Sequence, residues 1–500
     1  MALRSRKTDR DGSFSGNRVE RAIIDIGSNT VRLVIYGGSP RAPITVFNEK
    51  VVARLGRDIA DSRRLADDAV DMALRGLRRF AVLLEELNIE RVDVVATAAA
   101  REAENGPDFL AAIREFGLEP RLLSGEDEAR ISAMGAIGAF PGVEGVVADL
   151  GGGSLELIGV GDDTPNSSCS LPLGTLRLAK FRGENPDEMR RNLDAAINQI
   201  EWLGGGTPTL TLVGGTWRAM AAVAMELQKC PLTDPHGFTL SSGEVKALAR
   251  RLSMASTGDL SRFTRLSSMR ANYLPDAGVL LGVLLDRIKP GEVTFSSWGL
   301  REGILFDELD HSAKAQDPLL AGVGEFASLR GTPPLLATRV AAWTVGALPA
   351  GSEGSERVRL AATMLALASM QIEPNLRTEI AMDWALQKRW INVDACGRAM
   401  MAAAVSANKR ECNLPEALRE LASDDQIEEA ICWGLAIRLC RRLGGRSSRI
   451  FNASSLSISD SKLVLAIDDE LSGLYGLPTE KDLHLLADRL GLEFEVKIRS

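Results

Sequence analysis

The chain has 500 residues, of which 45% are hydrophobic and 25% are charged, and its formal net charge is −8. At roughly 150 residues per domain, this length predicts about three domains. The acidic balance and an aromatic content of only 5% argue against a nucleic-acid-binding protein, which needs a basic surface and stacking rings. No apolar run approaches the ~18 residues that a membrane helix requires, so an integral membrane protein is not expected.

The cysteines and the first residues of the chain indicate its cellular setting. The six cysteines include no C-x-x-C pair, which favours free thiols in a reducing cytoplasm over disulfides or a zinc site. No apolar signal-peptide segment is visible near the start, and we expect residues 1–18 to form a disordered tail.

Between residues 19 and 310, short apolar runs alternate with helical patterns, which predicts an α/β fold. To residue 150, we expect strands at 22–26, 31–36, 44–50, 92–97 and 146–150 and helices at 65–87, 107–116 and 126–137. From 151, we expect strands at 155–160, 209–213 and 293–296 and helices at 190–203, 219–227, 242–252, 275–288 and 298–308. Only helices are predicted from 315 to 445, and a small αβ tail follows at 446–500, with strands at 450–456, 462–467 and 494–498 and a helix at 479–491.

Three strands end in glycine-rich turns with hydroxyl side chains. They are Ala22-Ile-Ile-Asp-Ile-Gly-Ser-Asn-Thr30, Val146-Val-Ala-Asp-Leu-Gly-Gly-Gly-Ser154 and Leu210-Thr-Leu-Val-Gly-Gly-Thr216. Glycine lets several backbone N–H groups converge on one phosphate oxygen, because no Cβ blocks the approach. One such turn is a weak signal, whereas three of them together indicate a phosphate site.

The acidic residues in the first two turns suggest a metal. Asp25 and Asp149 offer the hard oxygen ligands that Mg²⁺ prefers. The repeated strand, acid and glycine turn also suggests two similar halves that face each other across a cleft, as in actin-like and sugar-kinase folds. The P-loop pattern G-x-x-x-x-G-K-[ST] is absent from the sequence.

The segment Leu123-Ser-Gly-Glu-Asp-Glu-Ala-Arg130 predicts a helix start, with Ser124 as N-cap and acidic residues in the first turn. One of these carboxylates would activate water, or all of them would only complement the helix dipole. Glu126 and Glu128 lie about 200° apart around the helix, so they cannot face one cleft together. The residues alone do not say which one faces inward. Arg101 either reaches a phosphate from the end of the strand at 92–97 or lies on the surface.

Taken in order, the motifs run from about residue 20 to 310. They are Asp25–Thr30, Ala96–Ala103, Ser124–Arg130, Asp149–Glu156, Leu171–Thr175, Gly214–Thr216 and Gly299–Gly303. This set resembles the exopolyphosphatase/guanosine pentaphosphate phosphatase (Ppx/GppA) family. The resemblance implies two actin-like (sugar-kinase-type, ribonuclease H-like) domains, at 19–150 and 151–310, that face each other across a cleft.

The resemblance also implies that the helical region at 315–445 is a degenerate HD-like domain, followed by the separate tail. An intact HD site needs several histidines as metal ligands. The three histidines of this chain, His236, His311 and His484, all lie outside that region. We therefore expect no metal site there.

The activity that the resemblance implies is Mg²⁺-dependent release of terminal orthophosphate from inorganic polyphosphate. The alternative is removal of the 5′ phosphate of guanosine pentaphosphate, and a second alternative is a non-catalytic sensor of polyphosphate or nucleotides. A homodimer, a cytoplasmic location and a monovalent cation as a second ion also follow from the resemblance.

Residue roles carry over by resemblance. Glu128 matches the base that activates water, and Arg101 matches a second catalytic residue that also contacts phosphate. The metal ligands would be Asp25, Asp149 and Glu156. With the third turn included, the predicted phosphate-binding residues are Gly27, Ser28, Asn29, Arg101, Gly151, Gly152, Gly153, Ser154, Gly214, Gly215 and Thr216. Ala98 stands where relatives often carry a hydroxyl, which would loosen one phosphate contact.

Two basic stretches remain outside these motifs. The stretch from Arg438 to Arg449 is either a helix end on the surface or a guide for a long polyanion. Arg177, Lys180 and Arg182 form a second candidate for the same role.

Overall fold

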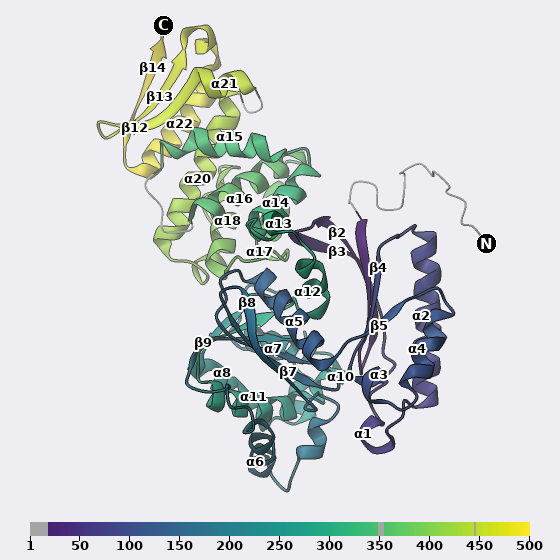
Figure 1. Ribbon diagram of the computed structural model, residues 1–500. Coiled ribbons are helices and arrows are strands. Elements are labelled where there is room, and N and C mark those ends of the chain that lie inside the picture. Colours follow the sequence, from purple (N-terminus) through teal and green to yellow (C-terminus); the bar gives the residue numbers. More distant parts are fainter. Residues whose placement is uncertain (1–18, 349–354, 445–446) are drawn as a thin grey trace, which may run out of the picture. The chain divides into compact units, whose positions relative to one another are not determined.

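The computed structural model describes residues 19–348, 355–444 and 447–500. The described chain divides into two compact units (Figure 1). The first unit extends to Cys230 and includes Pro235–Gln316, and the second consists of Pro231–Asp234 and Asp317–Ser500. The tail predicted at 1–18 lies outside the described residues. Within those residues, no helix has both the length and the apolar character that crossing a membrane requires.

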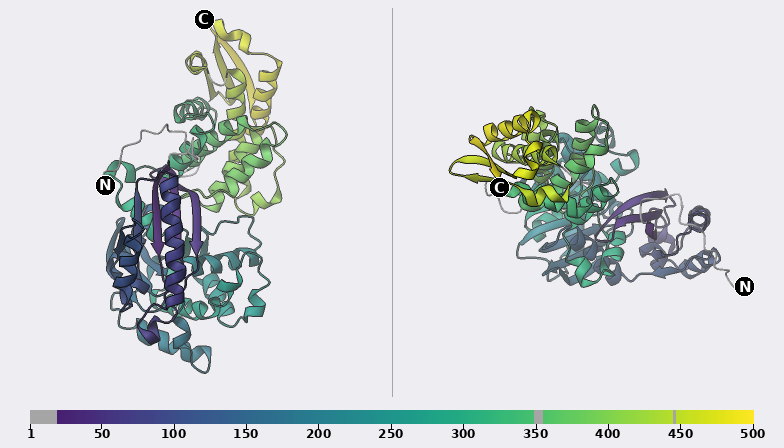
Figure 2. Two further views of the ribbon diagram at one scale, coloured as in Figure 1. Left: turned by 90° about the vertical axis from the view of Figure 1, so that its right-hand side faces the viewer. Right: turned by 90° about the horizontal axis from the view of Figure 1, so that it is seen from above.

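The first sheet of unit 1 has the strand order β3-β2-β1-β4-β5. Its strands are β1 (Val19–Ile26), β2 (Val31–Ser39), β3 (Ala42–Val51), β4 (Val92–Ala96) and β5 (Pro120–Leu122). Strands β1, β2 and β3 pair antiparallel, whereas β4 and β5 add in parallel to β1. Its helices are α1 (Ile59–Ser62), α2 (Asp67–Glu86), α3 (Ala98–Glu102) and α4 (Gly106–Arg114). Figure 2 shows α2 running alongside the strands, where its buried Leu77 and Phe80 share a core with Ile24 and Leu33.

The second sheet has the order β10-β11-β9-β6-β7-β8. Its strands are β6 (Gly145–Leu150), β7 (Leu155–Gly161), β8 (Thr164–Leu171), β9 (Thr207–Val213), β10 (Thr239–Ser241) and β11 (Pro290–Ser296). Three antiparallel strands again lead into parallel ones, because β6 pairs antiparallel with β7 and parallel with β9. The predicted boundary at residue 150 is therefore wrong for residues 145–150, since hydrogen bonding places them in the second sheet.

Helices α5 (Gly125–Ala139) and α12 (Leu300–Asp307) pack together between the two sheets. Residues of α5 share one cluster with β6 and β7, and Ile131 shares another with Ile23 and Val95 of the first sheet. The helices cross closely because glycines line the contact. A Cβ at Gly303 would lie 1.8 Å from the Ile131 carbonyl oxygen, and a Cβ at Gly135 would lie 2.2 Å from the Gly299 oxygen.

Several local predictions differ from the structure. The helix expected at 190–203 is α6 (Pro186–Ile197), which begins earlier because the Asn185 side chain caps it by accepting from the Glu188 N–H. The polar strand β8 was not predicted, because only its last residue is buried enough to mark it as a strand. The strand expected at 450–456 begins instead as helix α21 (Ser448–Ala453) and continues as β12 (Ser454–Ser459).

The other helices of unit 1 are α7 (Gly215–Leu227), α8 (Ser242–Ser253), α9 (Thr257–Leu260), α10 (Ser268–Ala271), α11 (Leu274–Ile288) and α13 (His311–Lys314), with a 3-10 turn at Leu178–Phe181. Helices α6, α7, α8 and α11 share a hydrophobic core with the second sheet. The apolar face of α11 is buried along most of its length, which accounts for its long apolar run.

Unit 2 begins with helices alone, as predicted for this region. They are α14 (Pro318–Ser328), α15 (Pro334–Val345), α16 (Ser355–Ala368), α17 (Arg377–Leu386), α18 (Ala395–Ala407), α19 (Glu416–Arg419) and α20 (Asp424–Leu443). A three-stranded sheet follows, built from β12, β13 (Lys462–Asp468) and β14 (Glu493–Arg499), with α22 (Leu477–Leu490) as the crossover. Short 3-10 turns lie at Ser369–Gln371 and Asp469–Leu474.

The tail predicted at 446–500 shares its core with the helices. Leu463, Leu465 and Leu483 belong to the same buried cluster as Val340 and Leu439. Backbone pairing strengthens this union, because the Ile458 N–H donates to the Gly346 carbonyl at 2.9 Å. Residues 317–500 are therefore one unit by packing, since the small sheet has a single apolar face and must cover it.

The close crossing of α5 and α12 generates a stability prediction. Replacing Gly303 with Ala should lower the free energy of unfolding by about 3 kcal/mol, because the new methyl group meets backbone that cannot rotate away. Urea unfolding would measure this change. Gly243→Ala is the matched control: Gly243 lies in the first turn of α8 with open space around it, so this variant should be as stable as the unmodified protein or slightly more stable. Equal stability of the Gly303→Ala variant and the unmodified protein would contradict this account of the crossing.

Candidate active site

The two acidic loops have the same backbone geometry. In the first, the Gly27 N–H donates to the Thr30 carbonyl at 3.0 Å, and in the second the Gly151 N–H donates to the Ser154 carbonyl at 3.0 Å. Each loop joins two antiparallel strands, β1 to β2 and β6 to β7. The repeat seen in the sequence is therefore a repeated hairpin, placed once in each sheet.

The two loops lie against each other. A Cβ at Gly153 would lie 2.6 Å from the Ser28 Oγ, and a Cβ at Gly152 would lie 3.1 Å from the Asn29 nitrogen. Ser28 is consequently buried. Any larger residue at Gly153 would push the loops apart, so the two halves meet at this point because of the glycines.

The third predicted turn joins the same place. Gly214 follows β9 with φ of 122°, a conformation that side chains with a Cβ rarely adopt. A Cβ there would also lie 2.5 Å from the Leu150 carbonyl oxygen and 3.3 Å from Asp149 Oδ1. Gly214 thus allows the start of α7 to approach the carboxylate of the second loop.

A cavity of about 570 Å³ opens where these loops meet. It is lined by all but one of the predicted site residues: Asp25, Gly27, Ser28, Asn29, Glu128, Asp149, Gly151, Gly152, Gly153, Ser154, Glu156, Gly214, Gly215 and Thr216. Arg101 is the exception, because it does not line the cavity but donates from Nη1 to Glu128 Oε2 at 3.1 Å. The structure therefore brings the predicted set together, with Arg101 behind Glu128.

Glu128 lies in the first turn of α5, at the cavity wall, and its side chain is 12% exposed. Burial raises the pKa of Glu128 to about 7, although the Arg101 guanidinium opposes this rise. Asp149 and Asp25 add to the rise because they are also negative. Asp127 is exposed, and neither it nor Glu126 lines the cavity. The three-dimensional fold thus selects Glu128 from the three acidic residues.

Glu156 lies on β7 directly opposite Asp149 and is buried. Burial raises its pKa well above the ordinary value, and Glu128 and Asp149 raise it further. Hydrogen bonds from Ser154 and Ser170 favour the charged form, the Ser170 Oγ lying 2.9 Å from Glu156 Oε1. Because Glu128 and Glu156 influence each other, they titrate as a pair.

Five arginines in the cavity were not predicted as site residues: Arg32, Arg218, Arg265, Arg270 and Arg301. Burial lowers the pKa of Arg32, and Arg301 and Arg270 add to this effect. Burial also lowers the pKa of Arg301, but Tyr36, Glu302, Asp25 and Asp149 together raise it above the ordinary value. These cations supply the positive potential that an anionic substrate needs, although the chain as a whole is acidic.

The position of one of these arginines, Arg32, could have been predicted from the sequence. Arg32 pairs with Asp25 across the first hairpin, in the position that Glu156 occupies opposite Asp149 in the second. Paired residues of antiparallel strands point to the same face. A four-residue turn after Asp25-Ile26 would therefore have placed Arg32 beside Asp25. Arg265 and Arg270, from the loop before α10 and from α10 itself, show no such pattern.

The donor set fits a divalent cation. Asp25 and Asp149 both line the cavity, burial raises the pKa of each, and Asp25 raises that of Asp149 further. A bound cation would relieve this repulsion. Within the described part of the chain, no three His, Cys, Asp or Glu side chains form a ready ligand group. Asp25 and Asp149 would hold such an ion, and water and substrate would supply further ligands.

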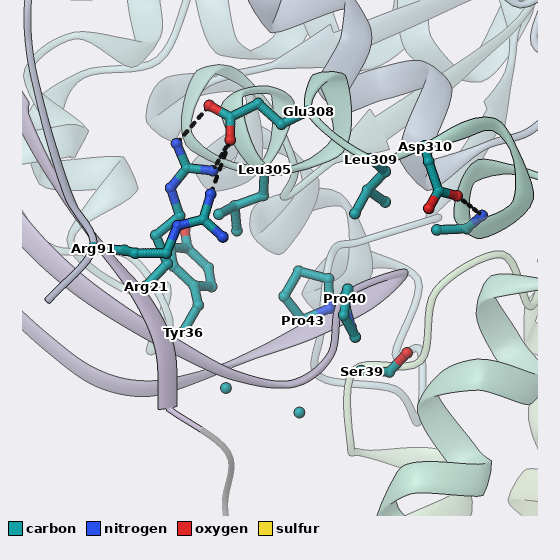
Figure 3. Close-up of a pocket in the computed structure, with 13 residues that line it drawn as sticks. Arg21, Tyr36, Ser39, Pro40, Pro43, Arg91, Leu305, Glu308, Leu309 and Asp310 are labelled. Atoms are coloured by element: carbon teal, nitrogen blue, oxygen red, sulfur yellow. Dashed lines mark hydrogen bonds and ion pairs between the residues drawn. The ribbon is translucent and has the colours of Figure 1, made fainter. Parts of the chain in front are cut away.

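A second cavity, of about 330 Å³, lies away from these loops, between β1, β2 and α12. Figure 3 shows that Arg21 and Arg91 both point to Glu308 at its edge. Leu305, Leu309, Pro40 and Pro43 line the rest. The charged groups are paired with one another, so this cavity offers no chemistry comparable with that of the first.

The two basic stretches engage in ion pairs. Arg177 pairs with Glu102, Lys180 with Asp61 and Arg182 with Asp276. In unit 2, Arg438 and Arg442 both pair with the buried Asp482, at 2.9 and 3.0 Å. These five basic residues therefore form ion pairs with carboxylates of the protein itself.

The carboxylates of the cavity generate a second prediction. Asp149→Asn should raise the melting temperature measured without divalent ions, because the raised pKa of Asp149 means that its charge costs stability as the pH rises through that value. The increase that MgCl₂ produces in the unmodified protein should shrink in the variant. Thermal unfolding with and without MgCl₂ tests both effects, with the exposed Asp162→Asn as control. An undiminished response to MgCl₂ would contradict the assignment of Asp149.

Known proteins share this arrangement. The model of the Ppx/GppA phosphatase family matches residues 34–312. Exopolyphosphatase 1 of Mycobacterium tuberculosis is 28% identical over 309 residues, which cover 58% of this chain and 88% of that protein. Exopolyphosphatase 2 of the same organism is 30% identical over 244 residues, which cover 43% and 76%.

A solved structure gives the same result for the fold. The crystal structure of the Aquifex aeolicus member of this family superposes with a TM-score of 0.51 and 27% identity, covering 57% of this chain and 96% of that one. The two repeated sheets of unit 1 accordingly form an actin-like pair of α/β domains. The family model matches more than half of this chain, so the chain belongs to the Ppx/GppA phosphatase family.

Proposed function

We propose that this protein is an exopolyphosphatase, a hydrolase that releases orthophosphate from the end of inorganic polyphosphate. The observation that carries this proposal is the single cavity in which two glycine loops, five arginines and Glu128 meet. The activity named for the mycobacterial relatives supports the same substrate. The arginines of the cavity come from several separate elements, and cations distributed in this way suit a substrate that carries many phosphates.

Glu128 is the general base in this proposal. Its carboxylate takes a proton from water, the water oxygen attacks the terminal phosphorus, and the bond to the bridging oxygen breaks. A pKa of about 7 leaves Glu128 largely unprotonated just above neutral pH while it remains basic enough to accept the proton. Arg101 holds the carboxylate in place through its hydrogen bond at 3.1 Å.

The loops and arginines bind the phosphates. Backbone N–H groups of Ser28, Asn29, Gly152 and Gly153 would hold the phosphoryl oxygens, because these residues line the cavity. Arg301 and Arg270 neutralise charge on the same group and its neighbour. Mg²⁺, held by Asp25 and Asp149 with Glu156 nearby, would supply charge neutralisation of the terminal phosphoryl group.

The remaining parts of the proposal rest on the resemblance of the motifs. The helical part of unit 2 is proposed to be a degenerate HD-like region. A homodimer, a cytoplasmic location and a monovalent cation are proposed on the same ground. Tyr273 is the only aromatic residue among those that line the cavity, so the lining residues do not indicate a guanine site. An assay therefore tests the two alternatives, a guanosine pentaphosphate phosphatase and a non-catalytic sensor.

A direct comparison of substrates tests the proposed function. With MgCl₂, the protein should release phosphate from long-chain polyphosphate with a higher kcat/KM than from guanosine pentaphosphate, and chelation of the metal should abolish both. Phosphate release measured side by side provides the comparison. A preference for the nucleotide would replace the first proposal with its alternative, and no release from either would favour a sensor.

Replacement of the proposed base generates a kinetic prediction. Glu128→Gln should lower kcat by about 10²- to 10⁴-fold while KM changes little, because the amide keeps the shape but cannot accept the proton. Initial rates of phosphate release give both constants. Glu126→Gln, in the same helical turn but outside the cavity, is the matched control and should keep normal turnover.

The pH dependence provides a further control on Glu128. In the unmodified protein, kcat/KM should rise as the pH passes through about 7, since the base must be deprotonated and its pKa is raised to that value. The Glu128→Gln variant should lack this rise. Normal turnover in Glu128→Gln would reject Glu128 as the base.

A further inference from the structure

Unit 2 contains a group of aromatic and cationic side chains far along the chain from the phosphate site. Phe326 of α14 meets Trp384 and Trp390 edge-on, with ring centroids 4.9 and 5.4 Å apart. The Lys388 ammonium lies 4.8 Å from the Trp390 ring centroid and 5.4 Å from that of Phe326. The Arg330 guanidinium covers Phe326 at 3.7 Å. Lys388 and Arg330 therefore share one aromatic surface.

The charged groups that act on Lys388 are all positive. The three that act on it are Arg330, Arg389 and Arg398. The nearby carboxylates serve other groups, because Asp234 forms a two-point ion pair with Arg389 at 2.7 and 2.8 Å, and Asp394 caps α18 by accepting from the Gly397 N–H. Among the described residues, no ion pair joins Lys388 to a carboxylate. The neighbouring guanidinium groups thus oppose its positive charge.

Burial lowers the pKa of Lys388 to about 8, and Arg330, Arg389 and Arg398 lower it further in the same direction. At neutral pH, about one tenth of Lys388 is then a neutral amine, against well under one hundredth for a lysine with an ordinary pKa. The side chain is only half-buried, so a small reagent can reach the nitrogen. Neutral amines are nucleophiles.

We propose that Lys388 is a site of covalent acylation, and that the acyl donor is an acyl phosphate. The neutral amine attacks the acyl carbon, a C–N bond forms and the C–O bond to phosphate breaks. Phosphate leaves with the electron pair, and the nitrogen loses one proton to water. The product is an uncharged amide, which relieves the repulsion among the cations.

The choice of donor follows from the charges. An acyl phosphate is anionic, and the Arg330 guanidinium lies over the same Phe326 ring as the amine that the donor must approach. Guanidinium groups bind phosphate oxygens in paired hydrogen bonds and stabilise charge on a departing phosphate. An uncharged acyl donor gains nothing from them.

Acetyl phosphate applied briefly to the full-length protein tests the proposal, with the acylated fraction of each lysine read by peptide mass spectrometry. At pH 7, Lys388 should react at least about tenfold faster than the exposed Lys246. The rate at Lys388 should level off above pH 8. Equal rates, or no levelling, would overturn the proposal.

Two further measurements separate charge from simple exposure. Arg330→Met keeps the contact with Phe326 but removes a repelling charge, so acylation of Lys388 should slow several-fold. A rate that is unchanged or faster would show that exposure alone governs the reaction, and would overturn the proposal.

An uncharged N-hydroxysuccinimide ester should favour Lys388 over Lys246 less strongly than acetyl phosphate does. An equal preference with both reagents would overturn the assignment of the donor.

Discussion

The contact between Ser28 and the backbone of Gly152 and Gly153 is the constraint on which the site depends. No Cβ fits there, because one at Gly153 would lie 2.6 Å from the Ser28 Oγ. The contact brings the hairpins of two separate sheets to the same point, so that backbone N–H groups and carboxylates from both line one cavity. The crossing of α5 and α12 acts in the same way, since Gly135 and Gly303 let the helices approach and place Glu128 and Arg301 at that cavity.

The electrostatics of the cavity show why it suits a phosphate chain. Asp25, Glu128, Asp149 and Glu156 all have raised pKa values because each is buried, and the pKa values of Glu128, Asp149 and Glu156 are raised further by at least one of the other carboxylates. A buried, charged carboxylate destabilises the folded protein unless a bound cation neutralises it. Five arginines line the same cavity, so a metal ion bound together with a polyanion would neutralise charge of both signs there.

The repeated hairpin also shows how the two similar halves of unit 1 differ at the cavity. Asp25 and Asp149 occupy equivalent positions, but the residues paired with them are Arg32 and Glu156. The first half therefore contributes a cation at this position and the second half a carboxylate. Glu128 comes from α5, which packs against both sheets, and four of the five cavity arginines lie beyond residue 151. Each half therefore contributes both acidic and basic side chains to the cavity.

The alternation of strands and helices, the three glycine turns and the two acids beside them could be predicted from the amino-acid sequence, because they depend on local backbone geometry and on repeating burial patterns. Glu128 could not be distinguished from Glu126 without a known family, since the face of a helix that points inward depends on what packs against it. The position of β6 in the second sheet, the presence of Arg265 and Arg270 at the cavity, and the three arginines around Lys388 emerged from the folded structure. Each of these features depends on contacts between residues distant in sequence, which no local sequence pattern predicts.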